Sequence, residues 1–119
     1  MKRRMHKNLV SLLLIGIIVL SFSLSKAEEL KSFEVKAENY KFNPDTITVN
    51  KGDKVIIKAI AIDKDHGFGI KAFNINEPLP KGELISIEFT ADKKGEFTIR
   101  CTKFCGWKHF KMKGKLIVK

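Results

Sequence analysis

Cysteine and proline are scarce in this chain of 119 residues, and tryptophan and tyrosine occur once each. Two cysteines are too few for a disulfide-dense scaffold. Only eight glycines and three prolines are present and 44% of the residues are hydrophobic, which excludes collagen-like and intrinsically disordered classes. The length supports one domain, because domains usually contain roughly 100–150 residues.

Acidic residues are absent from residues 1–27 and from residues 100–119. Five basic residues lie in the first of these segments, so the net charge of +10 for the whole chain falls to +5 for residues 28–119. Residues 28–99 carry 11 basic and 13 acidic residues, whereas the last twenty residues carry seven basic ones. The positive charge is therefore concentrated at the two ends of the chain, and residues 28–99 between them are not basic.

Residues 1–27 have the pattern of a secretion signal. Basic residues precede an apolar stretch over residues 9–20, and Ser25 and Ala27 place small residues at positions −3 and −1 of a cleavage site. We expect cleavage after Ala27, which leaves residues 28–119 as one domain. The alternative is a retained membrane anchor through residues 9–24, although a spanning helix needs about 20 apolar residues.

Both alternatives place the domain in the periplasm or on the outer face of the cytoplasmic membrane. Nucleic acid is not an expected partner there, in spite of the positive charge. Disulfides persist in such a compartment, so the two cysteines are candidates for either a disulfide or a metal site.

Apolar and polar residues alternate with a period of two through much of residues 33–118, which predicts strands with one buried face. Turn signals at residues 43–45, 51–53 and 92–95 separate these segments. Residues 55–62 are apolar on both faces, as expected of a central strand in a sandwich. The sequence thus predicts an all-β sandwich or small barrel of about 90 residues.

Most of the soft metal donors of residues 28–119 lie in one short run, Cys101-x3-Cys105-x3-His109-x2-Met112. Thiolate, imidazole and thioether together are the donor set that copper favours. Zinc would use cysteine and histidine without a thioether. His66 lies in residues 63–69, which are expected to form a turn at the end of the sandwich. These five side chains predict a copper site.

Other interpretations fit the same residues. Cys101 and Cys105 can form a disulfide outside the cytoplasm. The spacing of the run also matches one face of a helix, although Gly106 interrupts it and strands are predicted on both sides. A zinc site is a further alternative, and His66 by itself would be an ordinary surface histidine.

The run from Cys101 to Met112 resembles the CuA loop of cytochrome c oxidase subunit II and nitrous oxide reductase. The segments at residues 66–68 and 74–76 resemble the single-anchor subunit II of B-type oxidases. The pattern between Tyr40 and Val55 resembles cupredoxins in general. The resemblance covers residues 33–119 and implies a Greek-key cupredoxin sandwich.

This resemblance implies two copper ions bridged by the two cysteine thiolates, with one histidine on each ion and two weak axial ligands. The implied ligands are His66, Cys101, the backbone carbonyl of Lys103, Cys105, His109 and Met112. The implied function is extracytoplasmic electron transfer, as an oxidase subunit II or as a free carrier, with a cytochrome or an oxidase subunit as redox partner. No catalytic base–nucleophile pair is evident, so we expect no substrate chemistry of the domain's own.

Two alternatives remain from the residues alone, a periplasmic copper-delivery protein for oxidase assembly and a cupredoxin with a single copper. Lysines crowd the ligand run and its exit, at positions 103, 108, 111, 113 and 115. They form either a solvated rim or a surface that steers an acidic partner.

Overall fold

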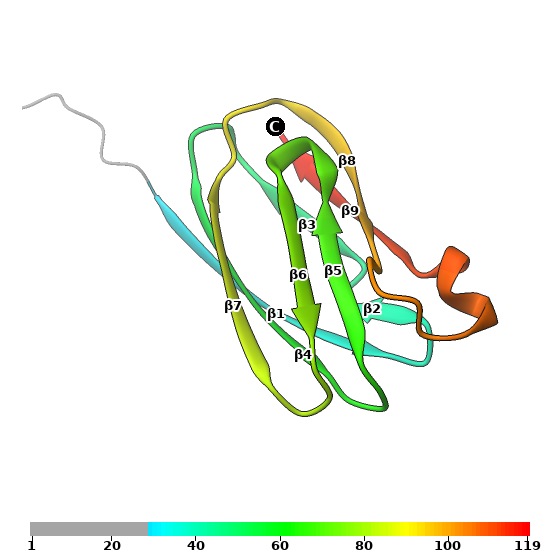
Figure 1. Ribbon diagram of the computed structural model, residues 1–119. Helices are drawn as coiled ribbons and strands as arrows, with labels where there is room; N and C mark the ends of the chain where they lie inside the picture. Colours follow the sequence, from blue (N-terminus) through cyan, green and yellow to red (C-terminus); the bar gives the residue numbers. More distant parts are fainter. Residues whose placement is uncertain (1–28) are drawn as a thin grey trace, which may run out of the picture.

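The computed structural model describes residues 29–119 and shows two β-sheets packed face to face (Figure 1). The predicted cleavage after Ala27 and the alternative anchor at residues 9–24 lie outside the described residues. Within residues 29–119, no helix is long and apolar enough to cross a membrane.

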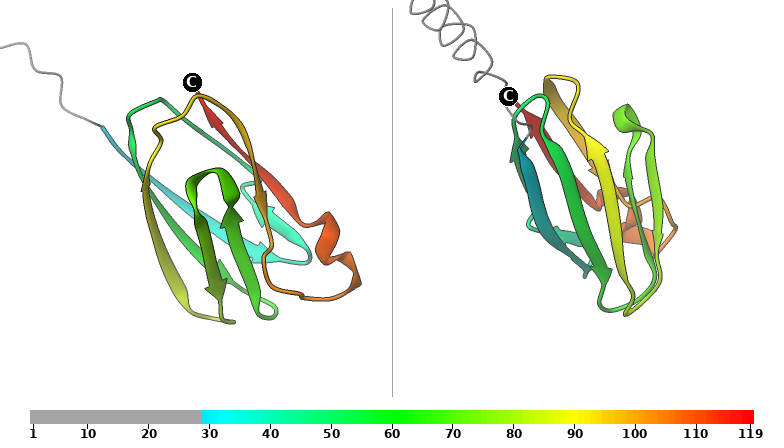
Figure 2. Two further views of the ribbon diagram at one scale, coloured as in Figure 1. Left: turned by 45° about the horizontal axis from the view of Figure 1, so that its top comes forward. Right: turned by 90° about the vertical axis from the view of Figure 1, so that its left-hand side faces the viewer.

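One sheet has four strands in the order β2-β1-β4-β7, and the other has five in the order β3-β9-β8-β5-β6. The first sheet contains β1 (Leu30–Glu38), β2 (Lys41–Asn43), β4 (Lys54–Ala61) and β7 (Leu84–Thr90). The second contains β3 (Thr46–Val49), β5 (His66–Ile70), β6 (Ile75–Leu79), β8 (Gly95–Arg100) and β9 (Lys113–Val118). Two short 3-10 turns, η2 (Lys71–Phe73) and η3 (Trp107–Lys111), complete the described elements. The predicted all-β sandwich is confirmed, and Figure 2 shows its two layers from the side.

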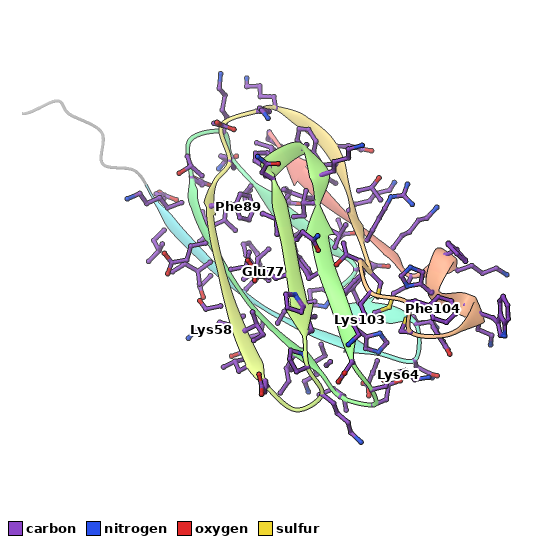
Figure 3. All side chains as sticks on the ribbon, in the orientation of Figure 1. Lys58, Lys64, Glu77, Phe89, Lys103 and Phe104 are labelled. Carbon is purple, nitrogen blue, oxygen red and sulfur yellow. The ribbon has the colours of Figure 1, made fainter. Side chains whose placement is uncertain are left out.

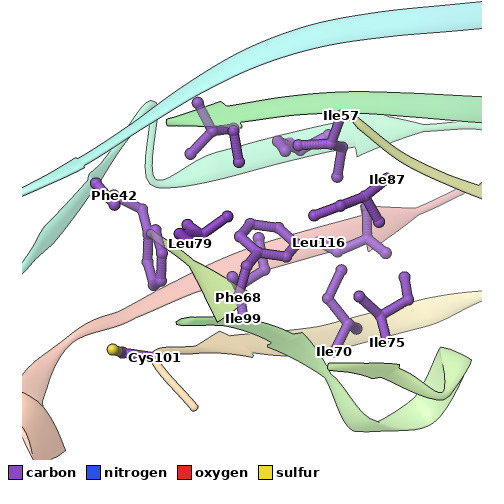
Figure 4. Close-up of a cluster of buried hydrophobic side chains, with 14 of the residues drawn as sticks. Phe42, Ile57, Phe68, Ile70, Ile75, Leu79, Ile87, Ile99, Cys101 and Leu116 are labelled. Carbon is purple, nitrogen blue, oxygen red and sulfur yellow. The ribbon is translucent and has the colours of Figure 1, made fainter. Parts of the chain in front are cut away.

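The hydrophobic core fills the space between the two sheets (Figure 4). Phe68 of β5 is fully buried and its ring packs edge-on against Phe42 of β2, with 5.6 Å between the ring centroids. Along β8 the inward-facing side chains are Phe97 and Ile99, and Cys101 continues this row just beyond the strand. The sulfur of Cys101 therefore lies at one end of the core, as the alternation predicts.

The prediction that residues 55–62 form a central strand of the sandwich is confirmed. Strand β4 is internal to its sheet, between β1 and β7, but only one of its faces is buried. Val55 and Ile57 point into the core, while Ile56 and Ile60 on the other face are half-buried. An internal strand of a two-layer sandwich has neighbours on both edges but contacts the second sheet with one face only.

The two ends of the described chain lie at the same end of the sandwich. The backbone N–H of Lys54 donates to the Glu29 carbonyl at 3.1 Å, and the N–H of Lys51 donates to the Lys119 carbonyl at 2.9 Å. The segment between β8 and β9, which carries most of the candidate ligands, projects at the opposite end (Figure 1). The candidate site is thus far from the point at which residues 1–28 join the domain.

Candidate metal centre

His66 is the first residue of β5 and is fully buried, so its predicted location in a turn is wrong. The connection from β4 ends at Asp65, four residues before the end of the turn predicted at residues 63–69. Gly67, the next residue, allows β5 to lie close beneath the ligand segment, which is the segment between β8 and β9. A Cβ on Gly67 would clash with Thr102 Oγ1 and lie 2.8 Å from the Lys103 backbone nitrogen. The missing side chain lets the two segments pack together, with His66 beneath Cys101.

Cys101 follows the last residue of β8, and its side chain is 6% exposed. Its Sγ atom lies 4.0 Å from His66 Nδ1 and accepts a hydrogen bond from the Gly67 backbone N–H at 3.4 Å. The Cys101 thiol donates to the Lys103 carbonyl at 3.1 Å. The structure therefore brings three of the predicted groups together, namely the His66 imidazole, the Cys101 sulfur and the Lys103 carbonyl.

Cys105 and His109 form the second half of the cluster. The Sγ atoms of Cys101 and Cys105 are 3.6 Å apart and both cysteines are free, so the structure does not contain the alternative disulfide. Cys105 Sγ lies 3.7 Å from His109 Nδ1. The ligand atoms of His66, Cys101 and Cys105 all lie within 4.8 Å of one another, which is close enough for a shared metal site.

Met112 ends the 3-10 turn η3 and is 1% exposed. Its backbone N–H donates to the His109 carbonyl at 3.1 Å, and its carbonyl accepts the N–H of Cys101 at 3.3 Å. These two bonds close the loop from Cys101 to Met112 onto itself. The alternative of a helical core stripe is wrong, because only Trp107–Lys111 is helical, and it is a short 3-10 turn.

Asp63 is a site residue that the sequence analysis did not identify. Its Oδ1 atom is 2.7 Å from His66 Nε2, and its Oδ2 atom accepts the backbone N–H of Asn39 at 3.0 Å. Burial opposes ionisation of Asp63, but these hydrogen bonds outweigh it and lower its pKa to about 2. A carboxylate on Nε2 keeps the proton there, which leaves the Nδ1 lone pair directed at the cysteine sulfur.

The turn between β1 and β2 supports the site from the other side. Asn39 and Tyr40 both have positive φ, at 56° and 61°. The Tyr40 hydroxyl lies beneath Gly106, where a Cβ would collide with it, and accepts a hydrogen bond from Lys64 Nζ at 3.3 Å. No periodicity or motif marks Asn39 or Asp63, and the pattern that begins at Tyr40 does not indicate its contact with the site, because these contacts depend on the packing of three separate turns.

Removing the Asp63 carboxylate is expected to weaken copper binding by about 10- to 100-fold, because His66 loses the group that orients it. The Asp63→Ala variant would be titrated with Cu(I) against a competing chelator. Asp92→Ala is the matched control, since Asp92 lies in the turn between β7 and β8 and its exposed carboxylate contacts none of the cluster. Equal affinities for the two variants would contradict this role of Asp63.

The Cys105 thiol is expected to resist alkylation in copper-free protein at neutral pH. Burial and the hydrogen bond with Cys101 raise its pKa from the ordinary value of 9.0 to about 11. The thiolate is the nucleophile, so its rate with iodoacetamide should rise about tenfold per pH unit until the pH approaches that value. In urea-unfolded protein the reaction rate of the same cysteine should level off at a pH about two units lower. Identical pH–rate profiles for the folded and unfolded protein would contradict the raised pKa. Because the folded pKa is raised, this thiol's contribution to stability is present below pH 9 and is lost as the pH rises towards 11.

Comparison with known proteins places this geometry in a family. Residues 11–118 match the family model described as the Cupredoxin-like domain. Cytochrome c oxidase subunit 2 of Thermus thermophilus is 33% identical over 85 residues, which cover 71% of this chain and 63% of that protein. This chain therefore spans less than two thirds of the length of that relative.

Two solved structures have a similar fold. A chain of a heme-copper terminal oxidase dimer matches over 100% of both chains, with a TM-score of 0.68 and 22% identity. The periplasmic domain of subunit II of cytochrome oxidase from Bradyrhizobium japonicum matches over 81% of this chain and 87% of that one, with a TM-score of 0.61 and 18% identity. The chain belongs to the cupredoxin-like domain family, and its relatives include cytochrome c oxidase subunit 2.

Proposed function

We propose that the domain holds two copper ions at Cys101 and Cys105 and passes one electron at a time outside the cytoplasm. One observation carries this proposal: two free, buried sulfur atoms lie 3.6 Å apart, and each has a histidine Nδ1 within 4.0 Å. A mononuclear site needs one of these thiols and leaves the other without a role. A pair of thiols with one imidazole each fits two ions bridged by sulfur.

The donor set fits copper, because thiolate, imidazole and thioether are the ligands that this metal favours. Cys101 and Cys105 would hold the two ions through their sulfur atoms, and His66 and His109 would each bind one ion through Nδ1. The Met112 thioether and the Lys103 carbonyl would be further, weaker ligands. When bound, the copper pair supplies a one-electron carrier that shares the electron between two metals.

The protein's own contribution is a rigid and dry frame. His66 is fixed by Asp63 and by its place at the start of β5. The Cys101 sulfur accepts the Gly67 N–H, and the Cys101 N–H donates to the Met112 carbonyl. Ligands held in one geometry change little when an electron arrives or leaves, which keeps the transfer fast. The proposed role of the domain is electron transfer alone.

Burial favours electron transfer over the alternative of copper delivery. Cys101 and Cys105 are 6% and 8% exposed, and His66 is fully buried. A delivery site has to release its metal to another protein and therefore needs ligands that the partner can reach. Electrons, in contrast, pass through a few ångströms of protein.

The relatives support a location and a partner. The T. thermophilus relative is an oxidase subunit, and the B. japonicum structure is a periplasmic domain. We place this domain on the outer side of the cytoplasmic membrane, where a cytochrome or another oxidase subunit exchanges electrons with it. It acts there either as a subunit II or as a free carrier.

Copper counting tests the proposal. Protein loaded with excess copper and then freed of unbound metal is expected to contain two copper ions per chain by elemental analysis. The double variant Cys101→Ser/Cys105→Ser is the control for adventitious binding and is expected to retain none. One copper per wild-type chain would contradict the dinuclear site.

A further inference from the structure

We propose that the aromatic tip, defined as Phe104, Trp107 and Phe110, is the contact surface for an acidic redox protein. This inference rests on the proposed function, because it names the partner of the same copper centre. The partner that fits has an apolar patch over its redox group and carboxylates around that patch. Electron exchange with it moves one electron between its redox group and the copper pair, and no bond or proton is involved.

The aromatic tip is unusually exposed for side chains of this kind. Phe104, Trp107 and Phe110 are 61%, 90% and 70% exposed, although each has a ring large enough to anchor a core. Phe104 and Trp107 contact each other edge-on with 6.2 Å between ring centroids. Figure 3 shows Phe104 on the segment between β8 and β9, next to η3. Several exposed aromatic side chains in one place mark an interaction site, because aromatics dominate the centres of protein interfaces.

The aromatic tip lies directly on the candidate metal ligands. The rings of Phe104 and Phe110 pack against the His109 ring, with centroid separations of 5.7 Å and 5.1 Å. The Nδ1 atom of that ring lies 3.7 Å from Cys105 Sγ. A protein seated on the tip would therefore be separated from the cluster by a single histidine.

The charge around the aromatic tip is positive. Lys108 and Lys111 lie within η3, between and beside the aromatic residues, and Lys113 follows it. Within residues 29–119, no carboxylate lies within ion-pair distance of these three ammonium groups. The surface therefore attracts a partner with negative charge around its contact patch, and this attraction raises the association rate.

The nearby acidic groups are already engaged on the other side of the site. Asp63 binds His66 and Asn39, and Asp65 binds Lys103 Nζ at 3.2 Å and the Lys81 backbone N–H at 2.8 Å. Both lie in the β4–β5 turn and not in η3. Asp65 pairs with Lys103, and neither of the two carboxylates pairs with Lys108 or Lys111.

Two other occupants are less consistent with these observations. A second copy of this chain would bring the same lysines together, so that like charges would face each other across the contact. An anionic lipid surface would suit the charge and the aromatic side chains. It would, however, cover the shortest route to the cluster with a layer that carries no redox group.

The test measures electron transfer from a reduced c-type cytochrome to the oxidised, copper-loaded protein by stopped flow. Two reagents are compared: a basic cytochrome, and the same cytochrome with its lysines succinylated to carboxylates. At low ionic strength the wild-type protein is expected to react at least about tenfold faster with the succinylated form, and added salt should reduce this advantage. In each step the cytochrome iron loses one electron and the copper pair gains it.

Variants at the two ends of the sandwich show which lysines cause the preference for the succinylated cytochrome. Each variant is compared with wild type using the same cytochrome. Lys108→Glu/Lys111→Glu is expected to abolish or reverse the preference for the succinylated cytochrome. Lys51→Glu/Lys94→Glu makes the same change in net charge at the opposite end of the sandwich and should leave the preference unchanged. Trp107→Ala is expected to slow the reaction by about tenfold at both ionic strengths, because it removes apolar contact and not charge.

Several results would overturn the inference. These are a wild-type preference for the basic cytochrome, or equal effects of the two lysine pairs. If the wild-type protein shows no preference between the cytochromes but binds phosphatidylglycerol vesicles, and Trp107→Ala abolishes that binding, the aromatic tip is a lipid-binding surface. If it instead forms a dimer that Trp107→Ala abolishes, the aromatic tip binds a second copy of this chain. Failure of the proposed function can be told apart from failure of this inference. It would be seen before any cytochrome is added, because the wild-type protein would not hold two copper ions that dithionite can reduce.

Discussion

The Cys105→Ser variant is expected to lose the dinuclear copper centre and to keep the fold. Serine retains a hydrogen-bonding group of similar size but is a poor ligand for copper, so one of the two bridging sulfur atoms is gone. Copper content should fall from two ions per chain to one or none. Because Cys105 lies outside the strands, the free energy of unfolding should change by only about 1 kcal/mol.

Circular dichroism of the copper-free variant provides the control for this experiment. Its melting temperature should lie close to that of copper-free wild type. Cys101→Ser is the useful comparison, because Cys101 continues the core row of β8 and accepts the Gly67 N–H. It should lose the centre as well and should cost more stability. A Cys105→Ser protein that is unfolded before copper is added would show that the loop placement is wrong.

The Gly67→Ala variant is expected to separate the ligand segment from β5 and to prevent assembly of the site. Its Cβ would clash with Thr102 Oγ1 and approach the backbone nitrogens of Lys103 and Thr102 to 2.8 Å and 3.0 Å. Backbone atoms cannot turn away as a side chain can, so the strand and the loop must move apart. Overpacking of this kind typically costs about 1–3 kcal/mol, and here it also displaces Cys101 from His66.

Gly69 offers a matched control with a different obstacle. A Cβ at Gly69 would clash with the Thr102 methyl carbon, and its next contact is the Ile75 carbonyl at 3.3 Å. Adding Thr102→Ala should therefore restore copper binding and stability to Gly69→Ala but not to Gly67→Ala, which still meets the backbone. Urea unfolding and copper content measure both effects. Equal rescue of the two glycine variants would contradict the close approach at Gly67.

The local part of the site was predictable from the sequence, because a single run of twelve residues carries four of its donors. The period-two pattern of β8 also placed Cys101 at the end of the core, which the structure confirms. The burial of His66 was not predictable. A residue after two aspartates and a lysine has the composition of an exposed turn, and it is the pairing of His66 with Leu79 of β6 that shows that β5 begins there.

The supporting contacts depend on packing between distant segments and carry no local signal. Asp63 is three residues from His66, but its bond to Asn39 joins turns that are 24 residues apart. Tyr40 contacts Gly106 only because the turn after β1 and the ligand segment lie at the same end of the sandwich. Likewise, the apolar character of β4 could not show that its outer face would remain half-buried.

Electron paramagnetic resonance of the oxidised, copper-loaded protein tests the central claim most directly. If the sulfur atoms of Cys101 and Cys105 bridge two ions, one unpaired electron is shared between them. The spectrum should then show the hyperfine pattern of two equivalent copper nuclei, and Cys105→Ser should abolish it. The hyperfine pattern of a single copper nucleus in the wild-type protein would contradict the account.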